Sequence, residues 1–154
     1  MQVRRERLVS GAPAEIWRIV SDPNRLPAWW PGVSRVEEAS REAWTTVLIS
    51  PKGKSVRADY TLVEAREPEW LRWRQELEES PFERLLSEST TELELEPEPG
   101  GGTRVRLTLN QRPRGWARFS PFQLRTAAAR QAEGALEGLA ELLGEAAPSA
   151  EDAG

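Results

Sequence analysis

The sequence contains no cysteine and no histidine among its 154 residues. Without cysteine, the chain has no disulfide, no thiolate nucleophile and no cysteine-ligated metal. Without histidine, it lacks the side chain that most often acts as a general base at neutral pH, and also the commonest metal ligand. We therefore expect no Ser-His-Asp triad, no metal site and no cofactor.

Long apolar runs are also missing. No stretch of 18 apolar residues occurs, and the first ten residues, MQVRRERLVS, lack the apolar stretch of a signal peptide. We therefore expect no integral membrane segment and a cytoplasmic location. The net charge of −4 is too small to indicate a partner by itself.

The length of the chain fits one domain with a core of its own. We expect this single domain to cover residues 1–146 and the remaining residues 147–154 to form a disordered tail. Arginine greatly outnumbers lysine, which fits a GC-rich genome or a warm habitat, and we expect a bacterial protein.

The spacing of apolar residues predicts a strand, two short helices, six further strands and a long helix. Residues 3–10 alternate as in a strand, whereas Pro13, Ile16, Trp17 and Val20 recur at helical spacing, which indicates that Trp17 faces the core. Asp22 and Pro23 predict the start of a second short helix. Period-two runs then predict strands over 33–39, 43–50, 54–65, 69–78, 83–96 and 103–112. Their short connections favour an antiparallel meander.

The C-terminal helix is predicted over residues 121–144, because Ser120 and Gln123 have the spacing of a capping box. Its apolar stripe consists of Leu124, Ala128, Ala132, Ala135, Leu136, Leu139, Leu142 and Leu143. These elements predict an α+β domain in which a curved sheet wraps one helix.

The first half of this stripe consists largely of alanine, which leaves space between helix and sheet. The opposing sheet face carries Ser87, Ser89, Thr91 and Gln111, and each unpaired buried polar group would cost about 1–3 kcal/mol. Either these groups pair with one another in an ordinary core, or they line a cavity. We favour a cavity. To hold a ligand, its volume would have to exceed about 300 Å³.

The stretch PAWWPG, residues 27–32, places two tryptophans where the helix pair returns to the sheet. Adjacent side chains on a helix point about 100° apart, so both rings hardly fill the same gap. We expect one of Trp29 and Trp30 to be buried in the core and the other to lie at the cavity entrance.

Polar and aromatic strand residues complete the predicted site. Tyr60, the only tyrosine, either supports the core or orients a ligand, and Gln75 or a serine would help to orient it. The predicted ligand-binding residues are Trp29, Trp30, Tyr60, Trp73, Gln75, Ser87, Ser89, Leu124 and Ala128.

Arginines are numerous toward the C-terminus, but glutamates alternate on the neighbouring predicted strand. Glu88, Glu92, Glu94 and Glu96 would face arginines across the ladder if the strands over 83–96 and 103–112 pair. Because the arginines are then neutralised locally, we expect no nucleic acid as a partner.

Several stretches resemble the SRPBCC (START/Bet v 1-like) superfamily, in particular its polyketide cyclase/dehydrase branch. They are APAEIWRIVSDPNRLPAWWPGV (12–33), SPFERLLSESTTELELEP (80–97), GGTRVRLTLNQRPRG (101–115) and the final helix. The resemblance implies a helix-grip fold, in which a curved seven-stranded antiparallel sheet with two short helices grips a long C-terminal helix over its concave face. Members bind lipids, sterols, polyketides, hormones or quinones, and some cyclise or dehydrate polyketides. No catalytic residue is carried over to this sequence.

Three functions remain open from the sequence. The leading hypothesis is binding of a hydrophobic small molecule, lipid-, polyketide- or aromatic-like, by a monomer or weak homodimer. An alternative is a cyclase or dehydratase that uses a buried carboxylate or Tyr60. A further alternative is a co-chaperone-like interaction module, for which Trp70 beside a turn is the one indication.

Overall fold

The computed structural model describes residues 1–50 and 52–146, so the expected tail over 147–154 lies outside the described residues. The elements are β1 (Gln2–Val9), α1 (Pro13–Val20), η1 (Pro23–Arg25), α2 (Leu26–Trp29), β2 (Val33–Glu37), β3 (Ala43–Ile49), β4 (Ser55–Arg66), β5 (Trp70–Glu76), β6 (Leu86–Pro97), β7 (Thr103–Pro113), η2 (Gly115–Phe119) and α3 (Pro121–Ala146). The order and approximate bounds predicted from the sequence are confirmed.

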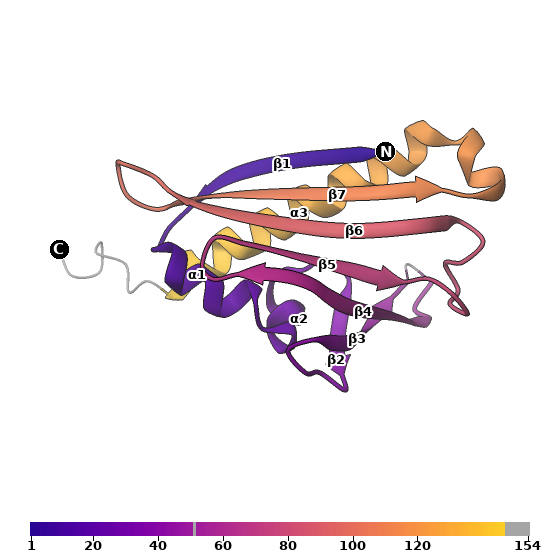
Figure 1. The fold of residues 1–154 in the computed structure, drawn as a ribbon, viewed down its shortest axis with the longest axis horizontal. Coiled ribbons are helices and arrows are strands. Elements are labelled where there is room, and N and C mark those ends of the chain that lie inside the picture. Colours follow the sequence, from indigo (N-terminus) through magenta and orange to yellow (C-terminus); the bar gives the residue numbers. More distant parts are fainter. Residues whose placement is uncertain (51, 147–154) are drawn as a thin grey trace.

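All seven strands form one antiparallel sheet in the order β1-β7-β6-β5-β4-β3-β2 (Figure 1). β2 to β7 follow one another as the meander that their short connections predict. β1 instead lies beside β7, with Gln2 opposite Asn110 and Val9 opposite Thr103. The helices α1 and α2 therefore carry the chain from one edge of the sheet to the other.

The two short helices begin as their sequence predicts. Pro13 stands at the start of α1, and Ile16 and Trp17 on its inner face are buried. The Asp22 carboxylate accepts a hydrogen bond from the Asn24 amide at 3.0 Å, which caps η1. The prediction that Trp17 belongs to the core is confirmed.

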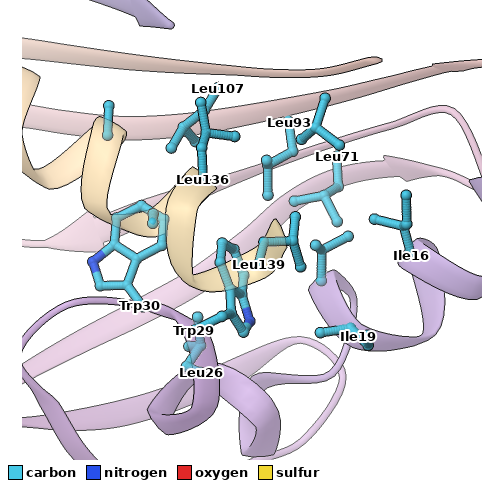
Figure 2. Packing of buried hydrophobic residues seen from close by; sticks show 14 of the residues in the cluster. Ile16, Ile19, Leu26, Trp29, Trp30, Leu71, Leu93, Leu107, Leu136 and Leu139 are labelled. Carbon is cyan, nitrogen blue, oxygen red and sulfur yellow. The ribbon is translucent and has the colours of Figure 1, made fainter. Parts of the chain in front are cut away.

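The long helix α3 lies along one face of the sheet, against β1 and β7 (Figure 1). Its buried residues are Ala128, Ala132, Ala135, Leu136, Leu139 and Leu143. Leu136 and Leu139 meet sheet residues such as Leu93 and Leu107 in one continuous core (Figure 2). The helix-grip α+β fold expected from the resemblance is therefore observed.

Two glycines allow α3 to approach the segment after α2. A Cβ atom on Gly138 would lie 2.4 Å from the Trp29 carbonyl oxygen, and one on Gly134 would lie 2.8 Å from Cγ of Pro31. Real Cβ atoms do not come so close, so this packing requires glycine at both positions. The rings of Trp29 and Trp30 lie beside the turn of α3 that carries Leu136 and Leu139 (Figure 2).

Candidate functional site

A pocket lies between the sheet and the helices. It is lined by Leu26, Trp30, Val33, Trp44, Thr46, Leu48, Tyr60, Trp73, Gln75, Ser89, Thr91, Leu109, Gln111 and Gln131. These residues come from β2 to β7, from the α2 region and from the middle of α3. Strands brought together by the meander therefore build one wall, and α3 contributes Gln131.

The free space in the pocket is small. About 50 Å³ is available to the centres of water-sized molecules, and about 480 Å³ of empty space is present when the open mouth is included. Ligand pockets commonly have about 300–1,000 Å³. The expected large cavity is therefore not open in this conformation, and the rings of Trp30, Trp44 and Trp73 are among the side chains that line the remaining space.

These rings form a continuous aromatic chain. Trp30 contacts Trp73 with ring centroids 5.8 Å apart, and Trp73 contacts Trp44 at the same distance. Both contacts are edge-to-face, a geometry that aromatic rings favour. Tyr60 stacks on Trp44 with centroids 6.0 Å apart and an interplanar angle of 11°. The apolar part of the pocket is thus an ordered aromatic wall.

The polar part of the lining is uncharged. Its amides and alcohols belong to Thr46, Gln75, Ser89, Thr91, Gln111 and Gln131. Thr46 donates a hydrogen bond to the carbonyl oxygen of Ala58 at 3.3 Å. No aspartate, glutamate, lysine or arginine is among the described residues that line this pocket. The buried carboxylate that the enzyme hypothesis requires is therefore not found among the lining residues.

Tyr60 is the titratable group of the pocket. Burial raises the pKa of its phenol to about 12, and the nearby Thr46 side chain acts in the opposite direction. The hydroxyl consequently stays protonated at neutral pH. It suits hydrogen-bond donation rather than the abstraction of a proton.

Two buried indole N–H groups have no partner among the described residues, those of Trp29 and Trp44. An unpaired buried donor costs about 1–3 kcal/mol. Because Trp44 lines the pocket, its N–H is a hydrogen-bonding group without a partner in the aromatic wall.

A second, smaller pocket shares this wall. It has about 30 Å³ for the centres of water-sized molecules and lies among residues of the α1–α2 region, β3, β4 and β5. Leu26, Trp44 and Trp73 line both spaces. The Trp44–Trp73 contact therefore belongs to a partition between two small pockets.

Five of the nine predicted ligand-binding residues line the main pocket: Trp30, Tyr60, Trp73, Gln75 and Ser89. Leu124 is half-buried and Ala128 is buried, but neither lines it. Leu124 precedes Gln131 by seven residues, which is about 10 Å along a helix. The first turn of α3 therefore extends past the pocket.

Ser87 does not face the interior, contrary to the prediction. A bulge between Leu86 and Glu88 shifts the register of β6 against β7. Leu86 is consequently buried, whereas Ser87 is exposed and donates to the Arg112 carbonyl oxygen at 3.4 Å. An extra residue in a strand moves the preceding side chains to the other face.

The structure places the two tryptophans of the pair differently: Trp29 lies in the core, and Trp30 lines the pocket. Trp29 and Trp30 are only 3% and 9% exposed, so neither forms an exposed lip. Trp30 lines the pocket, whereas Trp29 packs against α3 and lines neither pocket. Both rings are covered because the glycines of α3 bring that helix directly onto this segment.

Trp44 is the main site residue that the sequence reasoning missed. A signal was present, since Trp44, Thr46 and Leu48 alternate in β3 and all three line the pocket. Gln131 had no comparable signal, because its polar side chain lies beside the alanine stripe of α3.

The outer face of the sheet carries the expected opposite charges. Glu94 lies opposite Arg106, Glu96 opposite Arg104 and Glu88 opposite Arg112 across β6 and β7. Arg106 donates to Glu94 at 2.8 Å and to Glu6 of β1 at 3.1 Å. The predicted ladder of opposite charges is confirmed for Glu88, Glu94 and Glu96. Glu92 differs from the prediction, because it lies opposite Thr108 of β7 and pairs instead with Arg72 of β5.

Trp70 is not a free interaction surface. The guanidinium carbons of Arg66 and Arg72 lie 5.0 Å and 5.1 Å from the centroid of its ring. The indication of a co-chaperone-like module that Trp70 supplied is therefore weakened.

Metal-binding clusters and membrane-crossing helices are not found in the described part of the chain. Its residues contain no group of three or more acidic, histidine or cysteine side chains arranged to hold a metal ion. None of the helices described over residues 1–50 and 52–146 combines the length and apolarity needed to cross a membrane.

A seven-stranded antiparallel sheet and a long C-terminal helix across it give this chain the helix-grip α+β fold of START-like structures. The chain belongs to the family described as polyketide cyclase / dehydrase and lipid transport, whose model matches residues 1–144. No curated protein matches the sequence of this chain.

Solved structures share the fold at low sequence identity. TTHA0849 from Thermus thermophilus is 23% identical, with a TM-score of 0.77 over 96% of this chain and 99% of that chain. A START superfamily protein from Mycobacterium smegmatis is 14% identical, with a TM-score of 0.75 over 94% and 97% of the two chains. The di-domain ARO/CYC StfQ of the steffimycin biosynthetic pathway is 18% identical, with a TM-score of 0.72 over 95% of this chain and 51% of StfQ.

Proposed function

We propose that this chain binds a small apolar or aromatic molecule in the pocket beneath α3 without catalysing a reaction. The observation that carries the proposal is the lining, in which Trp30, Trp44, Tyr60 and Trp73 stand beside uncharged amides and alcohols. Apolar walls with a few placed polar groups are typical of ligand sites. The family description, which includes lipid transport, supports a hydrophobic ligand.

Binding requires the aromatic partition to open. A space of about 50 Å³ admits little more than water, whereas movement of Trp44 or Trp73 would join the two pockets that these rings separate. The indole N–H of Trp44 would then donate to an acceptor on the ligand and recover about 1–3 kcal/mol. The free energy of opening is offset by apolar burial, at about 25 cal/mol per Å².

Polar groups on the strands would orient the ligand. The Tyr60 hydroxyl stays protonated and donates, whereas the Gln75 amide both donates and accepts. A ligand with one carbonyl or hydroxyl on a ring system matches this arrangement. We further propose that the protein is cytoplasmic and acts as a monomer or weak homodimer.

A cyclase or dehydratase is the second candidate function, and the likeness to the ARO/CYC protein StfQ favours it. In this pocket, Tyr60 would hold a substrate carbonyl oxygen by donating a hydrogen bond. A cyclase or dehydratase reaction in this pocket would depend on Tyr60 alone for proton transfer, because no carboxylate is among the described residues of the lining. Binding without turnover therefore has the stronger support.

Native mass spectrometry of the purified protein tests the proposal first, by detecting a copurified small molecule. Titration with the uncharged dye N-phenyl-1-naphthylamine then measures saturable binding at one site. We expect Gln75→Leu and Trp44→Ala to change the affinity for the dye, and the exposed control Gln2→Ala to leave it unchanged. Absence of both a copurified molecule and saturable dye binding would overturn the proposal.

A further inference from the structure

Three exposed aromatic residues occur within seven positions of the sequence, where β7 leads into α3. Trp116, Phe119 and Phe122 are 70%, 79% and 81% exposed, more than any other large apolar side chain in the described part of the chain. They belong to η2 and to the first turn of α3, at the end of β7 (Figure 1). Clustered exposed apolar side chains mark interaction sites.

The stretch of sequence that contains these three aromatic residues is strongly basic. Between residues 99 and 132 the sequence contains seven arginines and no aspartate, glutamate or lysine. Arg104 pairs with Glu98 just after β6 and with Glu6 of β1, Arg106 pairs with Glu6 and with Glu94 of β6, and Arg112 lies 3.8 Å from Glu88. Among the residues that the structure describes, Arg114, Arg118 and Arg125 have no carboxylate within 4.0 Å. Their charges are therefore available to a partner.

We infer that residues 112–125 form a docking surface for an anionic lipid membrane. Tryptophan and phenylalanine partition into the interfacial region of a bilayer, and nearby arginines attract anionic headgroups. Each basic residue near such a surface contributes an attraction equivalent to about fivefold in affinity.

The distribution of charge over the chain fixes the orientation of docking. Residues 112–125 carry four arginines and no acidic residue, whereas the whole chain has a net charge of −4, so the rest of the chain carries −8. An anionic surface therefore attracts this segment and repels the remainder.

The shape of the surface favours a membrane over a folded partner. The three rings are 70% or more exposed, so they stand out from the surface instead of lining a groove. The guanidinium carbon of Arg118 lies 5.7 Å from the centroid of the Phe119 ring, which places positive charge beside an apolar side chain. Aromatic rings next to arginines match the boundary between acyl chains and headgroups.

Docking at this segment would also bring the pocket near the membrane. β7 precedes the segment and supplies Leu109 and Gln111 to the pocket, and α3 follows it and supplies Gln131. Membrane docking nevertheless requires only the exposed segment and does not depend on ligand binding in the pocket.

Co-sedimentation with vesicles tests the inference. We expect the full chain to bind vesicles of phosphatidylcholine with phosphatidylserine at low salt, to bind pure phosphatidylcholine less, and to be released as salt rises. The triple variant Trp116→Ala, Phe119→Ala, Phe122→Ala should lose about tenfold or more in affinity. The double variant Arg118→Gln, Arg125→Gln should lose about 25-fold in affinity, at about fivefold for each charge.

Matched controls come from exposed residues elsewhere. Leu8→Ala, Ile49→Ala and Val63→Ala remove apolar side chains that are 44–52% exposed, and Arg7→Gln removes an exposed charge. These variants should bind vesicles as the unchanged chain does, and thermal melting should show that all variants fold. The pocket variant Trp44→Ala should also retain vesicle binding, which separates this result from failure of the proposed ligand site.

Four outcomes would overturn the inference. They are no binding to anionic vesicles, equal binding to neutral and anionic vesicles, unchanged binding by the aromatic and arginine variants, and self-association in solution that the triple aromatic variant abolishes. The last outcome would assign the surface to a second copy of the chain.

Discussion

Gly138 of α3 packs directly against the backbone of Trp29, and a Cβ atom at Gly138 would lie 2.4 Å from the Trp29 carbonyl oxygen. The contact joins the long helix to the segment that carries the tryptophan pair. Trp30 follows immediately and lines the pocket. Because Gly138 has no side chain, α3 can approach the Trp29 backbone, and this contact helps to position the aromatic wall of the candidate site.

Gly138→Ala should destabilise the fold, since the new methyl group must displace backbone atoms. Overpacking of this kind costs about 1–3 kcal/mol, which exceeds the gain of about 1 kcal/mol in helix propensity. Gly144→Ala is the matched control, because a Cβ there meets nothing within 4 Å, and it should be neutral or stabilising. Urea unfolding measures both changes, and equal effects of the two variants would disprove the close-contact explanation.

Tyr60 should make stability depend on pH in the alkaline range. Its pKa is about 12 in the folded chain, against about 10 in the unfolded chain, so folding favours the neutral phenol. The contribution is complete below pH 10 and is lost as pH rises from 10 to 12, with a loss of about 2–3 kcal/mol. Since the chain has one tyrosine, absorbance at 295 nm follows its titration directly. In the Tyr60→Phe variant this part of the pH dependence should disappear.

Trp73→Ala should both destabilise the protein and open the pocket. The ring is 4% exposed and contacts Trp30 and Trp44, so its removal should cost about 3–5 kcal/mol. Indole added to this variant should raise its Tm by filling the space. Trp116→Ala, at a site 70% exposed, should change the free energy of unfolding by about 0.5 kcal/mol or less and should show no response to indole. Equal responses of the two variants to indole would contradict the assignment of the pocket.

Arg106→Gln should weaken the outer face of the sheet. Arg106 bridges Glu94 on β6 and Glu6 on β1, and both hydrogen bonds raise the pKa of its guanidinium. All three side chains are partly exposed, so the loss should be about 1 kcal/mol and should shrink at high salt. Arg7→Gln, a change at an exposed residue of β1, serves as control, and urea unfolding at low and high salt measures the difference.

The strand and helix pattern was readable from local sequence because each element obeys a simple period. The alternation of Leu71 and Trp73 with Arg72 and Arg74 marks one buried face of β5. Ser89 and Gln75 were assigned to the interior by the same reasoning and do line the pocket. The same reasoning assigned Ser87 to the wrong face of the sheet. A bulge depends on how two strands pair, so it cannot be recognised from the alternation of residues in one strand.

The sequence by itself determined the order of elements, the absence of histidine and cysteine chemistry, and the alanine and leucine halves of α3. Only the tertiary structure decided that Trp44 and Trp73 pack against each other in the pocket wall, and that Trp29 and Trp30 are both covered. It also decided that Trp116, Phe119 and Phe122 remain exposed. Periodicity indicates which side of an element is apolar, whereas occupancy of a shared space depends on which side chains from distant segments meet there.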